Sequence, residues 1–305
     1  MSLRASPDPL DDVARRWVER SAGRGWRVVG ARRLTGGIST ATHEVTLERG
    51  DGRRQRLVLR RPKRRWLEHD AGATALEAGT LAHVASSGLP VPEVVAVEPD
   101  LPRPALLMRK LPGRIDLDPA DPDRWVAQQA EALAAIHALP PVPGRDGEGD
   151  DNSWKLEPRT PPPWSAHPHL WERAIAAVAA GERDATRSFV HGDFQHFNLL
   201  WTRGRLTGIV DWGAGTWNHP DTDTGHCRLN LVILYGSAVA EDFLRRYEVA
   251  SGRTVDPWWD LVETVEFLPS WADTIRQQVR GRIPLDVDAM HRRVDAHLPV
   301  LLDRL

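Results

Sequence analysis

The strongest pattern in the chain lies in two neighbouring stretches, Val190-His191-Gly192-Asp193-Phe194-Gln195-His196-Phe197-Asn198-Leu199-Leu200 and Ile209-Val210-Asp211-Trp212. In each, a short apolar run typical of a buried strand accompanies polar residues. Asp193 and Asp211 supply carboxylates, and Asn198 supplies an amide. Carboxylate and amide oxygens suit Mg²⁺, and a carboxylate in a loop can accept the proton of an attacking hydroxyl. The pattern therefore favours phosphoryl transfer, in which Asp193 acts on the hydroxyl while Asn198 and Asp211 hold the metal of a nucleotide.

Ordinary structural roles are the alternative for these three residues. Asp193 could cap a turn, Asn198 could form an Asx-turn and Asp211 could end a strand. Each of these roles fits one residue taken alone. Their joint order, with an apolar run before each half, favours the functional interpretation.

The same residues resemble the catalytic loop of the aminoglycoside phosphotransferase family, whose members are relatives of the protein kinases. That loop has His-Gly-Asp, four further residues and Asn, with a metal-binding Asp later in the chain. The matching residues here are His191, Asp193, Asn198 and Asp211, and the resemblance covers about residues 26 to 235. It implies an α+β, two-lobed protein-kinase-like fold with an antiparallel-sheet N-lobe and a mostly helical C-lobe. It also implies ATP (or GTP) and Mg²⁺ as cofactors, and a small-molecule hydroxyl acceptor such as an aminoglycoside, macrolide, sugar or amino alcohol.

Length and composition are those of a globular chain with two domains or lobes. The 305 residues are 41% hydrophobic and 27% charged, with a formal net charge of −2, so we expect no nucleic-acid partner. No apolar run approaches the roughly 18 residues of a membrane span, and Met1 to Asp12 lacks the pattern of a signal peptide. A single cysteine suits a reducing compartment. We therefore expect a cytoplasmic protein without a membrane partner, and the sequence leaves its oligomeric state open.

Alternating apolar residues predict an antiparallel sheet in the first third of the chain, after a short amphipathic helix at 11–21. Gly50-Asp51-Gly52 is a turn signal between two of its strands. The predicted strands are 26–34, 42–48, 57–60, 94–97 and 105–113. Helices dominate beyond them. We therefore place an N-terminal nucleotide-binding lobe at residues 1–110 and a C-terminal catalytic and substrate-binding lobe at residues 111–305.

The connection between the first two predicted strands contains Gly36, Gly37 and Ser39. Paired glycines let a backbone approach a phosphate closely, and a serine hydroxyl can add a hydrogen bond. By itself the segment is more typical of an ordinary hairpin turn. Its place before a basic strand, far ahead of the catalytic loop, resembles the nucleotide-phosphate loop of the family. The resemblance therefore implies that these three residues bind phosphates.

The third predicted strand departs from the family pattern, because arginine stands where kinase-like proteins usually have lysine to hold the α- and β-phosphates. The strand reads Val58-Leu59-Arg60-Arg61, and we assign the role to Arg60, with Arg61 as the alternative. Arginine keeps its charge and can bind phosphate through two N–H groups. Glu77, within a helix predicted at 70–87, stands where the family has a glutamate that pairs with the strand cation. A surface glutamate is the alternative.

The last predicted strand, Ala105 to Gly113, ends in Pro-Gly and resembles the hinge between the two lobes. In the family this segment hydrogen-bonds the purine through its backbone. The resemblance implies that Met108 forms a wall of the base pocket and that Lys110 lies at the nucleotide.

Helices are predicted for most of the C-terminal lobe. Periodic apolar residues mark helices at 124–139, 170–180, 228–251, 258–280 and 286–302. His137 and the pair His226-Cys227 are assigned to helix packing. The segment 213–225 is predicted to be a loop. The family has an acid near this place that braces the catalytic loop, and of Asp221 and Asp223 we favour Asp223.

Aromatic and acidic residues near the C-terminus allow two interpretations. In the family, helices of this part form the acceptor pocket, and stacking and negative charge would suit a hydroxylated cation. Alternatively, the tryptophans face the core of amphipathic helices and the acids face water, which is slightly favoured. The residues are Trp258, Trp259, Asp260, Glu263, Glu266, Trp271 and Asp273.

Two other functions compete with a small-molecule kinase. A nucleotide-binding pseudokinase or regulatory protein is compatible with Arg60 in place of lysine. The intact Asp193, Asn198 and Asp211 oppose it. A protein kinase is disfavoured, because nothing in the sequence resembles the His-Arg-Asp loop or the Ala-Pro-Glu element.

Overall fold

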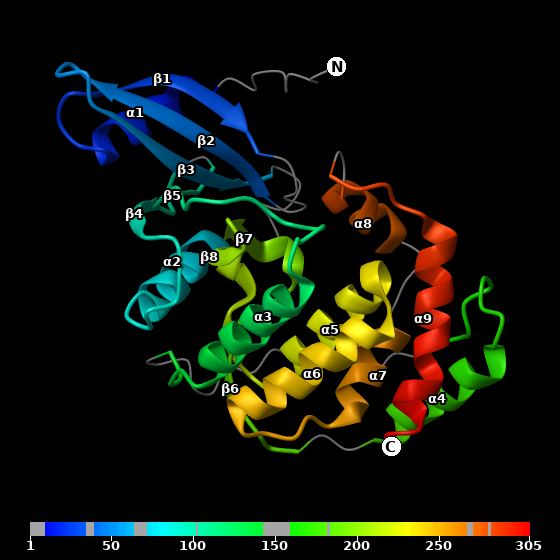
Figure 1. Cartoon of the computed structure of the whole chain (residues 1–305). Helices are drawn as coiled ribbons and strands as arrows, with labels where there is room; N and C mark the ends of the chain where they lie inside the picture. The colour runs from blue at the N-terminus through cyan, green and yellow to red at the C-terminus, as the bar shows by residue number, and fades with distance from the viewer. Residues whose placement is uncertain are drawn as a thin grey trace. The chain divides into compact units, whose positions relative to one another are not determined.

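The computed structural model describes residues 10–34, 40–63, 72–101, 103–142, 159–181, 184–266, 271–279 and 282–305. The chain divides into two compact units, Met1–Pro112 and Gly113–Leu305. The first contains an antiparallel sheet, and the second is mostly helical (Figure 1). The predicted α+β fold class is confirmed. The predicted phosphate-binding residues Gly36, Gly37 and Ser39 lie outside the described residues.

Five antiparallel strands form the sheet of the first unit, in the order β1-β2-β3-β5-β4. The strands are β1 (Trp26–Arg33), β2 (Thr40–Arg49), β3 (Arg54–Pro62), β4 (Val94–Glu98) and β5 (Ala105–Arg109). All five were expected from the sequence, but the last ends at Arg109 and does not continue to Gly113. Pairing of β2 with β3 is continuous along β3, so Arg60 and Arg61 are consecutive residues of a regular strand. Their side chains therefore face opposite sides of the sheet.

The apolar core of the first unit lies between the sheet and helix α1 (Asp12–Ser21). Trp17 and Val18 of α1 are buried together with Val45 and Leu47 of β2. Residues two apart in a strand face the same side, so the alternation in β2 carries both of its side chains into this core.

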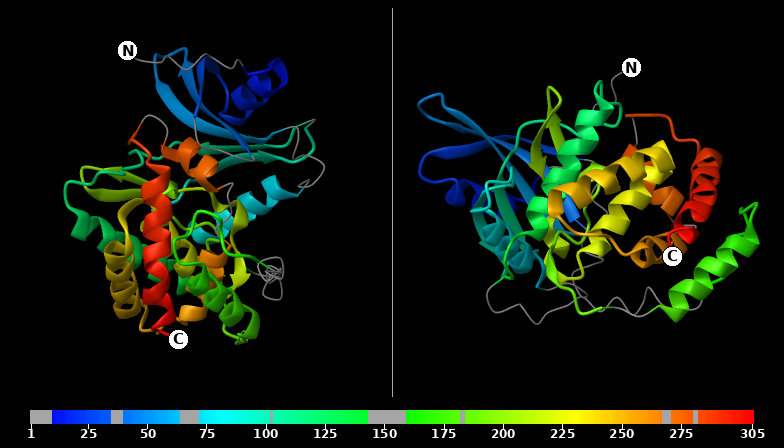
Figure 2. Two further views of the ribbon diagram at one scale, coloured as in Figure 1. Left: turned by 90° about the vertical axis from the view of Figure 1, so that its right-hand side faces the viewer. Right: turned by 60° about the horizontal axis from the view of Figure 1, so that its bottom comes forward.

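Helix α5 (Asp221–Tyr235) is central to the second unit and packs against α6, α7 and α9 (Figures 1 and 2). Nearly all of its residues are buried, including the polar Asp223, Arg228 and Asn230. Buried polar side chains need partners within the protein. The other helices are α3 (Pro122–His137), α4 (Pro168–Ala180), α6 (Ser237–Ser251), α7 (Pro257–Val265), α8 (Trp271–Val279) and α9 (Val287–Leu302). Within the described ranges, no helix has the length and apolar character needed to cross a bilayer.

Three predictions near the C-terminus need correction. The predicted helix at 228–251 belongs to two helices, because the chain turns at Gly236, where φ is 89°. The predicted loop at 213–225 contains a short strand and the first turn of α5, so Asp221 and Asp223 are helical. The predicted helix at 258–280 corresponds to α7 and α8, and residues 267–270 between them are outside the described part.

Two short antiparallel pairs carry the loops with the predicted catalytic residues. They are β6 (Ser188–Val190) with β9 (Thr216–Asn218), and β7 (Leu199–Thr202) with β8 (Arg205–Ile209). Two 3₁₀ turns, η3 (His196–Asn198) and η4 (Trp212–Ala214), adjoin them. Asp193 lies between β6 and η3, and Asp211 lies between β8 and η4.

Asp11 links α1 to the sheet, so its loss should destabilise the first unit. One carboxylate oxygen accepts the backbone N–H of Ala14 at 2.8 Å, and the other lies 2.5 Å from the buried guanidinium of Arg61. We expect Asp11→Ala to lower the free energy of unfolding by about 1–2 kcal/mol in a denaturant titration, because it removes a helix cap and a partner of Arg61. Asp12→Ala, at the exposed neighbouring position, should change it by less than about 0.5 kcal/mol. Equal losses in the two variants would contradict this role.

Candidate active site

The loop between β6 and η3 holds the backbone before Asp193 in a fixed turn. Gly192 has a φ of 80°, and a Cβ atom there would lie 2.3 Å from the carbonyl oxygen of Ala214. Both the left-handed conformation and this close approach require glycine. Nε2 of His191 lies 3.1 Å from the carbonyl oxygen of Val210. The His-Gly-Asp sequence therefore contacts the chain on both sides of Asp211, at Val210 and at Ala214.

Asp223, in the first turn of α5, holds this loop through two backbone hydrogen bonds. Its carboxylate accepts the N–H of His191 at 2.6 Å and that of Gly192 at 2.8 Å. The ring of His137 supports it, with Nε2 3.4 Å from Asp223 and Nδ1 2.7 Å from the hydroxyl of Tyr247. Burial alone would raise the pKa of Asp223, but His137, His191 and the backbone N–H together lower it. The predicted brace is confirmed, and His137 contributes to it.

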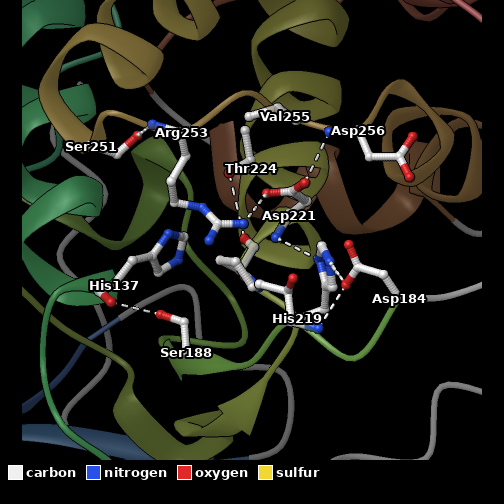
Figure 3. A network of polar contacts seen from close by, with 12 residues as sticks. His137, Asp184, Ser188, His219, Asp221, Thr224, Ser251, Arg253, Val255 and Asp256 are labelled. Atoms are coloured by element: carbon white, nitrogen blue, oxygen red, sulfur yellow. Dashed lines mark hydrogen bonds and ion pairs between the residues drawn. The ribbon is translucent and has the colours of Figure 1, made fainter.

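A polar network behind the loop fixes the start of α5 (Figure 3). Asp221 accepts the backbone N–H of Asp256 at 2.9 Å and lies 3.7 Å from a guanidinium nitrogen of Arg253. His219, just before the helix, lies 3.0 Å from the carboxylate of Asp184. Burial is the largest influence on Asp221 and raises its pKa above the ordinary value. Asp223, two residues later in the same helix, has a lowered pKa instead.

Three side chains that can donate hydrogen bonds surround the carboxylate of Asp193. Nδ2 of Asn198 donates to Oδ2 at 2.9 Å and to the Asp193 carbonyl oxygen at 2.8 Å. Oδ1 accepts from Nε2 of Gln195 at 2.5 Å and lies 3.1 Å from Nε2 of His226. The Asp193 side chain is held in one orientation and is still 36% exposed. A carboxylate that is both oriented and accessible suits a group that accepts a proton from a substrate hydroxyl.

His226 of α5 lies between two carboxylates, so the predicted packing role is incomplete. Its Nε2 faces Asp193, and its Nδ1 lies 3.2 Å from Oε2 of Glu263 in α7. Burial lowers the pKa of a histidine, but the hydrogen bonds to both carboxylates outweigh burial and raise the pKa of His226 to about 10. The ring is therefore a cation at neutral pH. A signal was available in the sequence, because His226 follows Asp223 by three residues, and such residues share a helix face.

The residues beside His226 allow close helix packing. A Cβ atom at Gly225 would lie 2.9 Å from the carbonyl oxygen of Trp259, so α5 and α7 approach each other closely here. Cys227 is fully buried, as its predicted packing role requires, and burial raises the pKa of its thiol. The close approach of the helices brings His226 within reach of Glu263.

Asn198 and Asp211 lie near the same end of the β7–β8 hairpin. The carbonyl oxygen of Asn198 accepts the N–H of Val210 at 2.9 Å, and Asp211 is the next residue. Because Nδ2 of Asn198 is committed to Asp193, the amide oxygen is the atom left for a cation. Asp211 has a φ of 71°, a left-handed conformation that is uncommon outside glycine.

This donor set fits Mg²⁺. One carboxylate and one amide oxygen are hard ligands, and Mg²⁺ usually takes its other ligands from water and substrate phosphates. In the part of the chain that the structure describes, no group of three or more His, Cys, Asp and Glu is arranged to hold a metal. Asn198 and Asp211 would thus supply two of the ligands of such an ion.

The two arginines of β3 have different partners within the first unit. Nε of Arg60 lies 3.2 Å from Oε2 of Glu77 in α2 (Ala73–Val84), and both side chains are largely buried. Arg61 binds Asp11 on the other side of the sheet. This difference favours Arg60 over Arg61 for contact with phosphates. The part of Arg60 and Glu77 in nucleotide binding stays a prediction.

The predicted base-binding residues lie at the end of β5. Met108 is buried and is paired with Val58 of β3 and Val94 of β4. Lys110 follows the strand, with Nζ 3.5 Å from the carbonyl oxygen of Leu111. Contact of Met108 or Lys110 with a nucleotide stays a prediction.

The acidic residues of α7, together with Glu266 at its end, are paired with cations inside the second unit. Asp260, Glu263 and Glu266 are each 3% exposed, so the interpretation in which the acids face water is wrong for these three. It holds for Asp273 of α8, whose side chain is 75% exposed. Trp258 and Trp259 are also buried, as that interpretation requires of the tryptophans. The pairs are Asp260 with Arg228 and Arg304, Glu263 with His226, and Glu266 with Arg159. These three acids therefore carry internal counter-charges, which weakens the case for a cation-binding pocket built on them.

The model of the phosphotransferase enzyme family (APH) matches residues 30–261 of this chain. The chain belongs to this phosphotransferase family. The matched range contains the residues described above from Arg60 to His226. A comparison with curated protein sequences gave no match.

Solved structures that resemble this phosphotransferase carry the same kinase-like fold. The macrolide 2′-phosphotransferase MphH from Brachybacterium faecium is 17% identical, with a TM-score of 0.61 over 94% of this chain and 97% of that one. The ADP-bound aminoglycoside phosphotransferase APH(2″)-Ib is 18% identical, with a TM-score of 0.57 over 95% and 97% of the two chains. Amicoumacin kinase hAmiN, in complex with AMP-PNP, is 13% identical, with a TM-score of 0.57 over 87% of each chain. The expected protein-kinase-like fold is confirmed.

Gly192→Ala should displace the loop that carries Asp193. A methyl group there would meet the carbonyl oxygen of Ala214, and the alanine backbone would have to adopt a left-handed conformation. We expect the free energy of unfolding to fall by at least about 2 kcal/mol in a denaturant titration. Gly213→Ala is the matched stability control, because a Cβ atom at Gly213 has nothing within 4 Å. It should cost less than about 1 kcal/mol. A harmless Gly192→Ala would refute the requirement for glycine.

The two aspartates at the start of α5 should respond differently to loss of charge. Because the pKa of Asp223 is lowered, its ionised form stabilises the fold, and this stabilisation is fully present above pH 3.8, the ordinary pKa. The stabilisation is lost as the pH falls through the lowered pKa. The raised pKa of Asp221 means that its ionisation costs stability above that pKa. At pH 7 we therefore expect Asp223→Asn to lower the free energy of unfolding by about 2–4 kcal/mol. Asp221→Asn should leave it unchanged or raise it.

Urea titrations of both variants at pH 7 measure this difference directly. The pair is well matched, because the two aspartates are buried to the same degree in the same helical turn. A loss in Asp221→Asn as large as that in Asp223→Asn would contradict the opposite pKa directions.

Proposed function

We propose that this phosphotransferase is a Mg²⁺-dependent small-molecule kinase that moves the γ-phosphate of ATP (or GTP) to a hydroxyl. The hydroxyl oxygen bonds to the γ-phosphorus, and the bond from that phosphorus to the β–γ bridging oxygen breaks. The hydroxyl proton passes to Asp193, and the products are a phosphate ester and ADP (or GDP). Bound Mg²⁺ supplies charge neutralisation at the phosphates.

The observation that carries this proposal is the pair of hydrogen bonds from Asn198 to Asp193 on a braced loop. Its Nδ2 holds the carboxylate of Asp193, the proposed proton acceptor, at 2.9 Å. Its amide oxygen remains for the metal, and Asp211 supplies the second ligand from the end of the same hairpin. One side chain thus couples the position of the proton acceptor to the position of the metal.

The nucleotide is assigned to the N-terminal lobe at residues 1–110, and catalysis and acceptor binding to residues 111–305. Arg60 would clamp the α- and β-phosphates, and its ion pair with Glu77 supports this by fixing the guanidinium. Met108 and Lys110 would lie at the base. The proposed phosphate cradle is Gly36, Gly37 and Ser39.

The acceptor is proposed to be an aminoglycoside-like, macrolide, sugar or amino-alcohol molecule, without a nucleic acid or membrane as partner. The structural neighbours are named for macrolides, aminoglycosides and amicoumacin. Because three acids of the C-terminal helices are already paired with cations, neutral acceptors deserve the same weight as cationic ones. Use of a nucleotide and a single buried thiol are both compatible with a cytoplasmic location.

Asp193→Ala should abolish transfer and spare nucleotide binding. The test is Mg²⁺-dependent consumption of ATP and of GTP with aminoglycosides, macrolides, amino alcohols and sugars. Loss of a proton acceptor typically costs about 10²–10⁴-fold in rate. Asp123→Ala, at an exposed position of α3, is the surface control and should keep full activity. Normal turnover by Asp193→Ala would refute its role.

A different result would support a pseudokinase. Arg60 in place of lysine is the feature that keeps this second function open. In that case the wild type binds nucleotide with Mg²⁺ but shows no acceptor-stimulated turnover with any member of the panel. Added EDTA should release the nucleotide in either case, because Asn198 and Asp211 hold the metal.

A further inference from the structure

The ring of His226 has a carboxylate at each of its nitrogens. Nε2 lies 3.1 Å from Oδ1 of Asp193, and Nδ1 lies 3.2 Å from Oε2 of Glu263. A carboxylate accepts hydrogen bonds, so each ring nitrogen must carry a proton to satisfy its neighbour. Nδ2 of Asn230 also lies 3.2 Å from Nε2, so it is the two carboxylates that favour an imidazolium bridging the loop of Asp193 and α7.

His226 differs in origin from the other donors to Asp193. Gln195 and Asn198 belong to the same short loop as Asp193, so they move with it. His226 belongs to α5, which is buried among three other helices. Among the described residues that contact the Asp193 side chain, His226 is therefore the one that fixes it relative to the helical core.

Glu263 holds the ring from the opposite side. Its side chain is 4% exposed and extends from α7, where the close approach at Gly225 brings the two helices together. A second carboxylate on the far nitrogen fixes the orientation and the protonation of an imidazole, as outer partners do in catalytic and metal sites. The ring of Trp271 in α8 lies beside the ring of His226, with the two centroids 5.9 Å apart. The imidazolium is thus held by three helices.

We propose that His226, bridged to Glu263, is a positioning residue that holds the carboxylate of Asp193 toward the acceptor hydroxyl. This inference rests on the proposed function, because it assumes that Asp193 takes the hydroxyl proton. The hydrogen bond to Oδ1 leaves Oδ2 to be shared between Asn198 and the hydroxyl. The positive ring also offsets the charge of Asp193 as the anionic γ-phosphate approaches, which lowers the repulsion between the two anions.

The kinetic test uses His226→Gln, Glu263→Gln and the double variant, with the acceptor found in the panel. We expect His226→Gln to lower kcat by about 10–100-fold, by analogy with the range found for residues that orient metal ligands. The nucleotide Kd should change by less than about 2-fold, because His226 acts on Asp193 and not on the nucleotide. The double variant should lose little more than His226→Gln, since the two residues act as a unit. Multiplied losses in the double variant would refute the bridge.

His297→Gln is the matched control for loss of a buried histidine. His297 of α9 is 2% exposed, and its Nδ1 lies 2.9 Å from the hydroxyl of Ser237, so its partner is neutral. If packing alone mattered, both histidine variants would lower stability and activity together. We expect His297→Gln to keep the wild-type kcat, whereas an equal loss of kcat in both would overturn the proposal.

A second measurement does not depend on turnover. In ¹⁵N NMR of the wild-type protein at pH 8, both ring nitrogens of His226 should be protonated, and Glu263→Gln should remove one of the two protons. A neutral His226 ring at pH 8 would overturn the inference and leave the proposed function intact. A wild type that turns over an acceptor, together with a His226→Gln variant of unchanged kcat, would also overturn the inference and leave the proposed function intact. A wild type that is inactive with every acceptor would overturn the proposed function itself.

Discussion

The carboxylate of Asp223 makes the contacts on which the rest of the candidate active site depends. It accepts N–H groups from His191 and Gly192, so it sets the direction of the chain just before Asp193. The first turn of a helix favours negative charge, because its N–H groups have no partners within the helix. Helix α5 can thus bury an ionised aspartate and place a loop with it.

Helix α5 combines two properties that rarely occur together. It is buried on nearly every side, yet it carries acids, a histidine, an arginine and an asparagine. Asp223 and His226 lie on one face of it, and they contact the backbone and the side chain of the same loop. In surroundings of low polarity, satisfied polar contacts are stronger and unsatisfied ones cost more. The geometry of the site and the stability of the core therefore depend on the same helix.

Local spacing was sufficient to predict the strands and to mark the loop from His191 to Asn198, because each depends on residues close in sequence. The fold class was implied by the resemblance of that loop to the phosphotransferase family. Three of the errors have a common cause in long-range contacts. The polar start of α5 resembled a loop, since its partners come from distant segments. His226 gains its role from Glu263, which is 37 residues away. Periodicity likewise favoured an exposed Glu266, but this residue is buried and forms an ion pair with Arg159, which lies far earlier in the chain.

Gly225 shows how a residue without a side chain limits the evolution of this site. The carbonyl oxygen of Trp259 occupies the space that a Cβ atom would need, so even alanine would force α5 and α7 apart. The ring of His226 reaches Glu263 across that same contact, and a small separation would break the bridge. Selection on the charged pair therefore acts on its uncharged neighbour as well. A substitution at Gly225 would therefore separate the charged pair without changing either charged residue.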